Sequence, residues 1–453
     1  MPSYDAIIIG TGQAGPSLAR RLAGAGQRVA IIERNRFGGT CINTGCTPTK
    51  ALVASAYVAH TARRAAEYGV TIGGDVGVDM RRVKARMNDI RGTSRNAVEH
   101  SLRNADNVTV ISGHARFASP RTVTVADETL AAERIFINVG ARPATPPIPG
   151  IDTVPYLTSS TILELDQVPA HLVVIGGSYV ALEFAQMYRR FGAAVSVIEH
   201  APRLTAREDP EISDAIRGIL AAEGIAIHLG AQNVAVKGEA GGVAVAFDGG
   251  RVEGSHLLLA AGRRPNTDAL GLDRAGVATD AHGVIGVNGR LETNVPGIWA
   301  LGECNGRGAF THTSYDDSEI VGANLLGGGS RSVRDRITAY AMFIDPPLGR
   351  VGMTEAEARA QARPILVGRM NMEDVSRAYE KGETQGLMKV VVDRDTQRIL
   401  GAAILGTGGD EAVHCILDTM YAGAPYAVLQ RAVHVHPTVA EFIPTLLADL
   451  APG

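Results

Sequence analysis

Two cysteines, Cys41 and Cys46, are the residues of this sequence whose type and spacing most directly indicate chemistry. They lie five positions apart within residues 38–50, GGTCINTGCTPTK, a spacing too long for a thioredoxin-type C-x-x-C. A distorted turn can nevertheless bring the two sulfurs together. Pro48 is typical of a first helical turn, so we expect a helix that runs through residues 51–66, with Cys46 near its positive end. That position lowers the pKa of a thiol and stabilises the thiolate.

A cysteine pair could also bind a metal or lie inert in a core. Zinc sites need further ligands at short spacing, and no second Cys or Cys/His pair lies close by. We therefore expect a redox-active pair and no metal site. The other two cysteines, Cys304 and Cys415, stand alone, and four cysteines in 453 residues do not make a disulfide scaffold.

A strand, a glycine turn, a helix, a second strand and an acid follow one another near the N-terminus. The segments are a strand at residues 4–9, the turn glycines Gly10, Gly12 and Gly15, a helix at 17–24, a strand at 29–32 and the acid Glu33. This order is typical of a dinucleotide-binding unit. Gly10 permits the turn, Gly12 lets a pyrophosphate approach the backbone, and Gly15 lets helix and strand pack. The helix N-terminus offers free N–H groups to phosphates, and Glu33 can accept hydrogen bonds from a ribose.

The same order returns in the middle of the chain. Its segments are a strand at residues 172–175, a turn with Gly176, Ser178 and Ala181, a helix through residue 190, a strand at 195–198 and the acid Glu199. In both copies the acid follows the first glycine by 23 positions. Ser178 replaces the second glycine, and its Cβ could push a nucleotide outward. Glu199 favours NADH because it would repel a 2′-phosphate, whereas Arg203 and Arg207 just beyond it could accommodate NADPH.

Length and composition limit the remaining possibilities. A chain of 453 residues suggests about three domains. The formal net charge is −3, so the chain has no excess of basic residues. We therefore do not expect a nucleic acid or an anionic membrane as partner. The sequence has no run of about 18 apolar residues, so it predicts no membrane span. No secretory leader is recognised either, and we therefore expect a cytoplasmic protein. The glycine-rich stretches 241–250 and 327–329 are expected to be surface turns.

Residues 39–50 closely resemble the active-site motif of the class I flavin-dependent pyridine nucleotide–disulfide oxidoreductases, written G-T-C-x-N-x-G-C-x-P-[ST]-K. The resemblance extends over nearly the whole chain. Residues 138–143 and 261–267 resemble the crossovers into and out of the family's second domain, residues 293–303 its second FAD motif, and residues 345–352 the start of its interface domain. The similarity implies an α/β fold with two Rossmann-like dinucleotide-binding domains and a C-terminal α+β dimerisation domain.

The resemblance also implies domain limits and cofactors. We expect an FAD domain over residues 1–150, a nicotinamide domain over 151–265, a return to the FAD domain over 266–335 and a dimerisation domain over 336–453. The first nucleotide unit would hold FAD, and the second would bind NADH or NADPH as cosubstrate.

The resemblance assigns roles to individual residues as well. Cys46 would be the charge-transfer thiolate against the flavin, Cys41 the interchange thiol that attacks substrate, and Lys50, paired with Glu183, would lie near flavin N5. The implied FAD contacts are Gly10, Gly12, Gly15, Glu33, Gly39, Thr40, Lys50, Gly140, Gly302, Glu303 and His312. The implied nicotinamide-dinucleotide contacts are Gly176, Ser178, Tyr179, Glu199 and Gly262, with Tyr179 covering the nicotinamide side of the flavin. Glu303 stands where the family normally has an aspartate.

Residues 436–441, HPTVAE, resemble the family's interface motif H-P-T-x-x-E. His436 would protonate the leaving thiol and stabilise the Cys41 thiolate, and Glu441 would orient its ring. In the family this histidine reaches into the active site of the partner subunit, which implies a homodimer. His434 is the rival histidine, but only His436 precedes Pro-Thr.

Three electron acceptors stay open. Residues 178–183 resemble those of mercuric reductases, but residues 447–453 lack the vicinal cysteines with which mercuric reductases deliver Hg(II), and the His436/Glu441 dyad fits a disulfide reductase. The mixture resembles a mercuric-reductase-like subgroup that includes bacterial enzymes acting on reactive chlorine products. We expect a small disulfide, oxidised-thiol or oxidant substrate. The alternatives are a metal-ion reductase for Hg(II) or Cu(II) and a dihydrolipoamide dehydrogenase.

Overall fold

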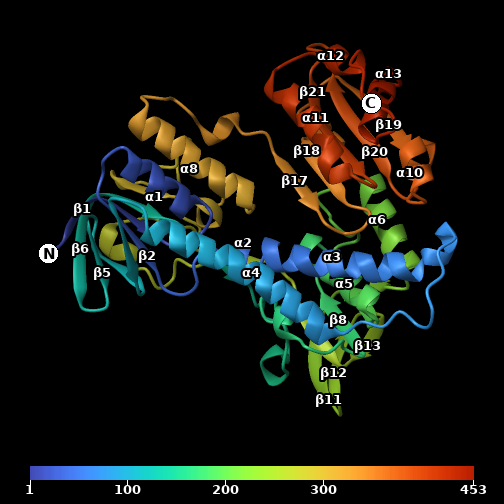
Figure 1. Cartoon of the computed structure of the whole chain (residues 1–453), viewed down its shortest axis with the longest axis horizontal. Helices are drawn as coiled ribbons and strands as arrows, with labels where there is room; N and C mark the ends of the chain where they lie inside the picture. The colour runs from blue at the N-terminus through green and yellow to red at the C-terminus, as the bar shows by residue number, and fades with distance from the viewer.

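A computed structural model of the protein describes residues 1–453 and shows an α/β chain built around several sheets (Figure 1). The N-terminal sheet has the strand order β3-β2-β1-β6-β5-β4, with β16 paired to β6. Its strands are β1 (Ser3–Ile9), β2 (Val29–Glu33), β3 (Val108–Ser112), β4 (Ala115–Ser119), β5 (Thr122–Val125), β6 (Glu128–Ile137) and β16 (Ile298–Ala300). Strands β3, β2, β1, β6 and β16 run parallel, so their carboxyl ends meet at one edge.

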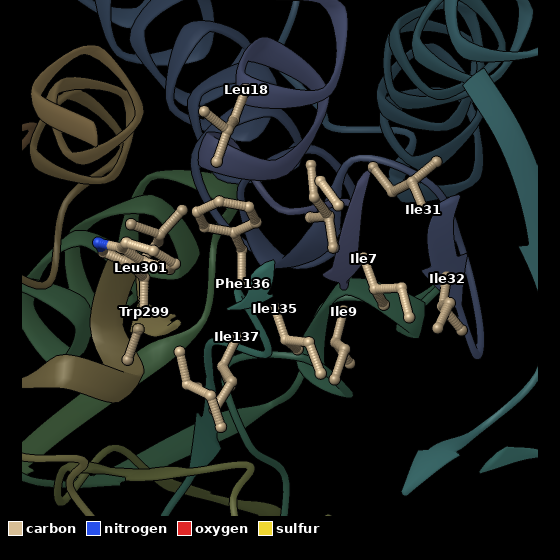
Figure 2. Packing of buried hydrophobic residues seen from close by; sticks show 14 of the residues in the cluster. Ile7, Ile9, Leu18, Ile31, Ile32, Ile135, Phe136, Ile137, Trp299 and Leu301 are labelled. Carbon is tan, nitrogen blue, oxygen red and sulfur yellow. The ribbon is translucent and has the colours of Figure 1, made fainter. Parts of the chain in front are cut away.

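Apolar runs form this sheet because its parallel strands are covered on both faces. Figure 2 shows Ile7 and Ile31 on adjacent strands, with Leu18 of helix α1 (Ala14–Gly24) turned toward the sheet. All three side chains are fully buried. Phe136 stacks on Trp299 with ring centroids 5.0 Å apart. Because full burial of such side chains stabilises by about 1.5–3 kcal/mol each, the sheet is a rigid support for the loops at its carboxyl edge.

A second parallel sheet, in the order β10-β9-β8-β14, repeats this arrangement in the middle of the chain. Its elements are β8 (His171–Ile175), α5 (Tyr179–Phe191), β9 (Ala194–Ile198), α6 (Pro210–Ala222), β10 (Ala226–His228) and β14 (His256–Leu259). An antiparallel meander of β11 (Ala235–Glu239), β12 (Gly242–Phe247) and β13 (Gly250–Gly254) shares a core with it. The prediction of a surface turn over residues 241–250 was therefore wrong, since Val243 and Val245 of β12 pack into that core.

Two short strands join the middle unit to the N-terminal one. β7 (Ala141–Pro143) and β15 (Arg263–Pro265) pair antiparallel, so the chain leaves and returns at the same place. After the return, β16 rejoins the N-terminal sheet and helix α8 (Thr311–Leu326) packs against α1. The middle unit is thus an insertion into the N-terminal unit.

Three helices between β2 and β3 lie where these two units meet. They are α2 (Gly39–Asn43), α3 (Cys46–Arg63) and α4 (Met80–Arg103). α3 packs against both α4 and α5 and crosses the centre of Figure 1. Gly45, with φ −133° and ψ −119°, is not helical, so α3 begins directly at Cys46. It ends at Arg63 rather than at residue 66, because a 3-10 turn over Ala65–Tyr68 follows.

A six-stranded antiparallel sheet forms the C-terminal layer, drawn in orange and red in Figure 1. Its order is β17-β18-β21-β20-β19-β22. The elements are β17 (Ala339–Met342), β18 (Leu348–Gly352), α9 (Glu355–Ala360), β19 (Ile365–Asn371), α10 (Ser376–Glu380), β20 (Leu387–Asp393), β21 (Ile399–Leu405), α11 (Gly409–Tyr421), α12 (Tyr426–Gln430), α13 (Ile443–Ala448) and β22 (Ala451–Pro452). None of the protein's helices combines the length and the apolar character needed to cross a membrane.

Candidate functional site

A cavity of about 1090 Å³ follows the carboxyl edge of the N-terminal sheet and reaches both cysteines. The predicted site residues in its wall are Gly10, Gly12, Glu33, Gly39, Thr40, Cys41, Cys46, Lys50, Gly140, Tyr179, Glu183, Glu303 and His312. The predicted site residues outside its wall are Gly15, Gly176, Ser178, Glu199, Gly262, Gly302, His436 and Glu441. The cavity is slightly larger than the range of about 300–1,000 Å³ that is usual for small-ligand and cofactor sites.

The first glycine turn leaves no room for side chains. A Cβ on Gly10 would lie 2.3 Å from the carbonyl oxygen of Asn138, and a Cβ on Gly15 would lie 2.3 Å from that of Gly10. Asn138 Nδ2 donates to the Gly12 carbonyl oxygen at 3.1 Å and ties the turn to the end of β6. A Cβ on Gly39 would lie 2.8 Å from the Cα of Gly12. The cysteine motif therefore starts in direct contact with the turn.

Glu33 closes the other side of this turn. Its Oε2 accepts hydrogen bonds from the Thr11 N–H at 3.0 Å and from the Thr11 hydroxyl at 2.5 Å. Its Oε1 accepts from the Asn35 N–H at 2.8 Å. The carboxylate thus sits beside the N-terminus of α1, where backbone N–H groups can receive a pyrophosphate and the carboxylate a ribose hydroxyl.

The two cysteines meet across the break between α2 and α3. The Cys41 thiol donates a hydrogen bond to the Cys46 sulfur, and Cys46 is open to the cavity. This hydrogen bond is the main cause that lowers the pKa of Cys46 to about 6, and the Thr311 hydroxyl and the Lys50 ammonium lower that pKa further. The same hydrogen bond raises the pKa of Cys41. At neutral pH the reduced pair therefore holds one thiolate, at Cys46, and one thiol, at Cys41.

Thr311 contacts the pair from α8. Its Oγ1 lies 3.3 Å from the Cys46 Sγ. Cys46 begins α3 and Thr311 begins α8, so two helix N-termini lie at one sulfur. The positive ends of both helix dipoles stabilise a thiolate there. The two residues are 265 positions apart, and no motif spacing connects them, so sequence reasoning missed Thr311.

Lys50 contacts two residues, Glu183 and Phe343, which are themselves joined by a hydrogen bond. Its Nζ lies 2.7 Å from Oε2 of Glu183, whose side chain is 3% exposed, and 4.6 Å from the ring centroid of Phe343. The other carboxylate oxygen of Glu183 accepts the Phe343 N–H at 2.9 Å. The structure thus brings together the predicted pair Lys50 and Glu183 and adds Phe343, so one positive charge is fixed beside Cys46.

Glu303 forms an ion pair that the sequence did not predict. Arg263 Nε donates to Glu303 Oε1 at 2.6 Å, and Arg263 Nη2 donates to the Ala141 carbonyl oxygen at 2.7 Å. Both charged side chains line the cavity. Gly302 lies behind this wall and donates its N–H to Asp317 Oδ2 at 2.7 Å. The longer side chain at position 303 thus reaches the crossover strand β15.

The second glycine turn is open rather than enclosed. Ser178 is exposed, with extended backbone at φ −104° and ψ 179°, and makes no capping hydrogen bond to α5. Glu199 packs against Gly177, since a Cβ on Gly177 would lie 2.8 Å from its Oε2. Glu199 Oε1 accepts the Ala201 N–H at 2.7 Å. Tyr179 and Val180, the first two residues of α5, extend from this turn to the cavity wall.

His436 and Glu441 lie together but away from the cysteines. His436 Nδ1 is 3.0 Å from Glu441 Oε2, and the histidine side chain is 74% exposed. Neither residue lines the cavity, so within one chain the dyad does not meet Cys41. His434 is half-buried, and its Nδ1 has no hydrogen-bond partner.

The residues of the cavity fit FAD. Its wall contains both the first glycine turn, whose pattern suits a phosphate, and two redox-capable sulfurs. Bare backbone at Gly12 and Gly140 lines the cavity, and a Cβ on Gly140 would meet nothing within 4 Å, which leaves space for a ligand. Asn43 Oδ1 is a buried acceptor in the same wall without a protein partner.

Comparison with known proteins gives matches over most of the chain. Residues 4–318 match the family model described as pyridine nucleotide-disulphide oxidoreductase, and residues 338–447 match that family's dimerisation domain. The chain is 39% identical over 456 residues to a probable pyridine nucleotide-disulfide oxidoreductase, RclA, of Escherichia coli strain K12, with 99% of each chain covered. It is 33% identical to a mercuric reductase of Streptomyces lividans, covering 97% of this chain and 94% of that protein.

A solved structure has the same fold. The Cu(II) complex of the HOCl-induced flavoprotein disulfide reductase RclA from Escherichia coli matches with a TM-score of 0.91 and 38% sequence identity. The match covers 99% of both chains. The predicted fold class is confirmed by this match and by the two family models.

Proposed function

The chain belongs to the pyridine nucleotide-disulphide oxidoreductase family and is an FAD-dependent enzyme that uses NAD(P)H, and we propose that its Cys41–Cys46 pair passes the electrons to a small disulfide, oxidised-thiol or oxidant substrate. The predictions of an enzyme, of the flavin and of the nicotinamide cosubstrate are thereby confirmed. The observation that carries the proposal is the Cys46 sulfur, open to the flavin cavity and hydrogen-bonded by Cys41 and Thr311. We also propose the predicted division of the chain into an FAD domain, an inserted nicotinamide domain and a dimerisation domain.

FAD held in the cavity by the first glycine turn and Glu33 would supply acceptance of a hydride from the reduced nicotinamide and transfer of two electrons to the Cys41–Cys46 disulfide. The open pair then acts through thiol–disulfide exchange. Cys41, once its proton is removed, attacks one substrate sulfur, forms a mixed disulfide and releases the first thiolate. Cys46 then attacks the Cys41 sulfur, releases the second thiolate and restores the intramolecular disulfide. The substrate gains two electrons, the pair loses two, and the two leaving thiolates take up two protons.

Lys50 and Thr311 support this sequence by stabilising negative charge on Cys46. The Lys50 ammonium is fixed by Glu183 at 2.7 Å, and the Thr311 hydroxyl lies 3.3 Å from the sulfur. The Lys50 charge and the Thr311 hydroxyl both favour the Cys46 thiolate, which is the form of Cys46 that attacks the mixed disulfide. They also keep the proton of the pair on Cys41, from which a base must remove it.

We assign that base to His436 of the partner subunit. The dyad of His436 and Glu441 is preformed, with 3.0 Å between its nitrogen and oxygen atoms, yet it lies away from the cavity of its own chain. Val433 is fully exposed and Val435 is 76% exposed on the same loop. Apolar side chains of this kind are suited to burial by a second copy of the chain. The dimerisation domain supplies the means of association.

We propose NADH as the preferred cosubstrate. The Glu199 carboxylate is held beside Gly177 and the Ala201 N–H, where the ribose of a bound dinucleotide would lie. A carboxylate at this place accepts hydrogen bonds from a free 2′-hydroxyl and repels a 2′-phosphate. Arg203 and Arg207 could bind the 2′-phosphate of NADPH, but both are exposed. No hydrogen bond within the chain holds either side chain beside Glu199.

A metal-ion reductase is the second candidate. The solved RclA relative is a Cu(II) complex, and another relative is a mercuric reductase. Soft thiolate ligands such as Cys41 and Cys46 suit Hg(II) and Cu(I). No group of three or more His, Cys, Asp or Glu side chains within one chain could hold a metal ion, so such a substrate would depend on the sulfur pair itself.

A panel of acceptors separates the candidates. Turnover is measured with NADH and with NADPH against glutathione disulfide, lipoamide, hypothiocyanite, Hg(II) and Cu(II). The disulfide assignment predicts that Cys41→Ala and His436→Ala both lose disulfide turnover, by about 10²-fold or more. The metal assignment predicts that Cys41→Ala abolishes metal turnover and His436→Ala spares it. Cys415→Ala is the matched control, because Cys415 lies in α11 outside the cavity wall.

A further inference from the structure

A short segment at the start of the C-terminal layer, residues 343–345, is held by two side chains of helix α5. Glu183 Oε1 accepts the Phe343 N–H at 2.9 Å. Gln186, one turn further along α5, forms two hydrogen bonds with the backbone of Asp345. Its Oε1 accepts the N–H at 2.7 Å, and its Nε2 donates to the carbonyl oxygen at 2.8 Å. Residues three apart on a helix lie on one face, so both side chains act on the same stretch of backbone.

The side-chain amide of Gln186 is oriented by charged neighbours. Its Nε2 also donates to Glu223 Oε1 at 2.8 Å. Arg190 joins Glu223 to Asp345, with N···O distances of 2.7 and 2.6 Å. Gln186 is buried, with 3% of its surface exposed, so its donors and its acceptor depend on these protein partners. The network therefore fixes one orientation of the amide, with the oxygen toward the Asp345 N–H and the nitrogen toward the Asp345 carbonyl oxygen.

The same segment carries the surface against which Lys50 lies. Lys50 Nζ is 4.6 Å from the ring centroid of Phe343 and 2.7 Å from Glu183 Oε2. Because the Phe343 N–H occupies the other carboxylate oxygen, Oε2 of Glu183 is directed at the ammonium. Movement of the backbone at Phe343 would displace the ring and the carboxylate together. Lys50 follows Cys46 by one turn of α3, and its charge lowers the pKa of that thiol.

We propose that Gln186 is a positioning residue that fixes the backbone of residues 343–345 and thereby keeps the Lys50 ammonium beside Cys46. The inference rests on the proposed function, in which the Cys46 thiolate attacks the mixed disulfide. Gln186 does not line the cavity, so it acts only through this segment. Without the amide of Gln186 the segment is released, and the Lys50 ammonium is free to turn away from the sulfur.

The experiment measures alkylation of Cys46 by iodoacetamide as a function of pH in the holoenzyme, after chemical reduction of the disulfide and with peptide mapping to separate the two cysteines. Gln186→Met keeps a side chain of similar length and removes every hydrogen bond of the amide. The pKa of Cys46 should rise from about 6, so alkylation at pH 6 should be about threefold slower than in the unmodified enzyme. The thiolate is lost as the pH falls through the pKa, so the difference should nearly vanish above about pH 8.

Arg189→Met is the matched control on the same helix. Arg189 Nε donates to the Glu223 carbonyl oxygen at 2.6 Å, and Arg189 makes no hydrogen bond with residues 343–345. The proposal predicts an unchanged alkylation profile in Arg189→Met, whereas a general loosening of α5 would shift the profile in both variants. An equal shift in both variants, or no shift in Gln186→Met, would overturn the proposal.

A double-mutant cycle with Lys50→Met makes the test specific. Lys50→Met alone removes the charge and slows alkylation of Cys46 at pH 6. If Gln186 acts through Lys50, adding Gln186→Met to this background causes no further change. A further decrease of about threefold in the Lys50→Met background would overturn the proposal.

A second variant covers the case in which Gln186→Met does not fold. Gln186→Glu keeps an oxygen that accepts the Asp345 N–H and loses the donor to the Asp345 carbonyl oxygen, so a smaller decrease in alkylation at pH 6, about 1.5- to twofold, is expected. An unchanged profile in Gln186→Glu, or a decrease that persists with Lys50→Met, would equally overturn the proposal. Failure of the proposed function is recognised separately, because alkylation is measured after chemical reduction, whereas NADH would then produce no protein thiols in the unmodified enzyme.

Discussion

The two glycine turns of the molecule share one sequence pattern but differ in their surroundings. The first turn is enclosed: Gly12 and Glu33 line the cavity, Asn138 bonds the turn from β6, and Gly39 of the cysteine motif lies against it. The second turn is open, and Ser178 is exposed outside the cavity. In both turns the first glycine touches the end of a neighbouring strand, so the strand–turn–helix scaffold is the same.

In the function proposed here, this difference would separate a resident cofactor at the first turn from an exchanging one at the second. A ligand at the first turn would contact the cysteine motif and the return segment at Glu303, because both line the same cavity. A ligand at the second turn contacts an open surface and can exchange in each catalytic cycle. Serine is tolerated at position 178 for the same reason, because no covering segment presses the ligand onto its Cβ.

The largest effect is expected at Gly12. In Gly12→Val the Cβ would lie 3.3 Å from Asn138 Nδ2 and its methyl groups would enter the cavity, so we expect purified protein with less than about one-tenth of the normal flavin content. The ratio of flavin to protein absorbance measures this. Ser178→Val is the matched change in the second turn, and it should retain the flavin. Full flavin content in Gly12→Val would contradict the claim that the first turn encloses the flavin.

The cysteine pair at the enclosed end provides the second prediction. Cys41→Ala removes the main hydrogen bond to Cys46, so the pKa of Cys46 should rise from about 6 toward an ordinary thiol value. The thiolate is present above pH 6 and is lost as the pH falls through that value, so alkylation of the variant at pH 7 should be about 30-fold slower. The rate of iodoacetamide alkylation as a function of pH measures the shift.

A matched pair of variants at Thr311 refines this result. Thr311→Val removes the hydroxyl that lies 3.3 Å from the sulfur, and Thr311→Ser keeps it. The valine variant should raise the pKa of Cys46 by less than Cys41→Ala does, and the serine variant should leave it unchanged. Equal alkylation profiles for both would show that the hydroxyl has no effect.

A substitution at Glu199 tests whether the second turn determines the preference for NADH over NADPH. Glu199→Gln removes the negative charge beside Gly177, so the preference for NADH over NADPH, as a ratio of kcat/KM values, should fall about tenfold. Glu33→Gln is the equivalent change in the first turn. It should alter flavin retention without altering that ratio. If Glu199→Gln keeps the NADH to NADPH ratio of the unmodified enzyme, Glu199 does not determine the cosubstrate preference.

The smallest effect is expected at Ser178. Ser178→Gly removes a Cβ from the open turn and lets the pyrophosphate approach the backbone, so the KM for NADH should fall by about twofold. Steady-state kinetics at saturating acceptor measure this. A change of tenfold or more would mean that the second turn is as enclosed around its ligand as the first.

Sequence reasoning was most successful where the relevant residues are close together in the chain. The turn glycines, Glu33, Glu199 and the Cys41–Cys46 motif lie within short segments whose spacing reflects local backbone geometry. Lys50 and Glu183 were paired only through resemblance to the family, and the structure places them 2.7 Å apart.

Contacts between distant segments could not be predicted from the spacing of residues along the chain. Thr311 reaches Cys46 from 265 positions away, and Arg263 reaches Glu303 from 40 positions away, through the packing of α8 and β15 against the cavity. The resemblance places Arg263 in a crossover segment and an FAD contact at His312 beside Thr311, but neither motif indicates the contact with Glu303 or with Cys46. The meander strand β12 was missed because its glycines suggested a turn, although Val243 and Val245 are buried.

The central claim is that electrons from the nicotinamide cosubstrate reach the Cys41–Cys46 pair. Anaerobic treatment of the air-oxidised enzyme with NADH, followed by alkylation and peptide mass mapping, tests it most directly. The account predicts that Cys41 and Cys46 become labelled together only after NADH is added, while buried Cys304 stays unlabelled throughout. Labelling of Cys41 and Cys46 that is the same with and without NADH would contradict it.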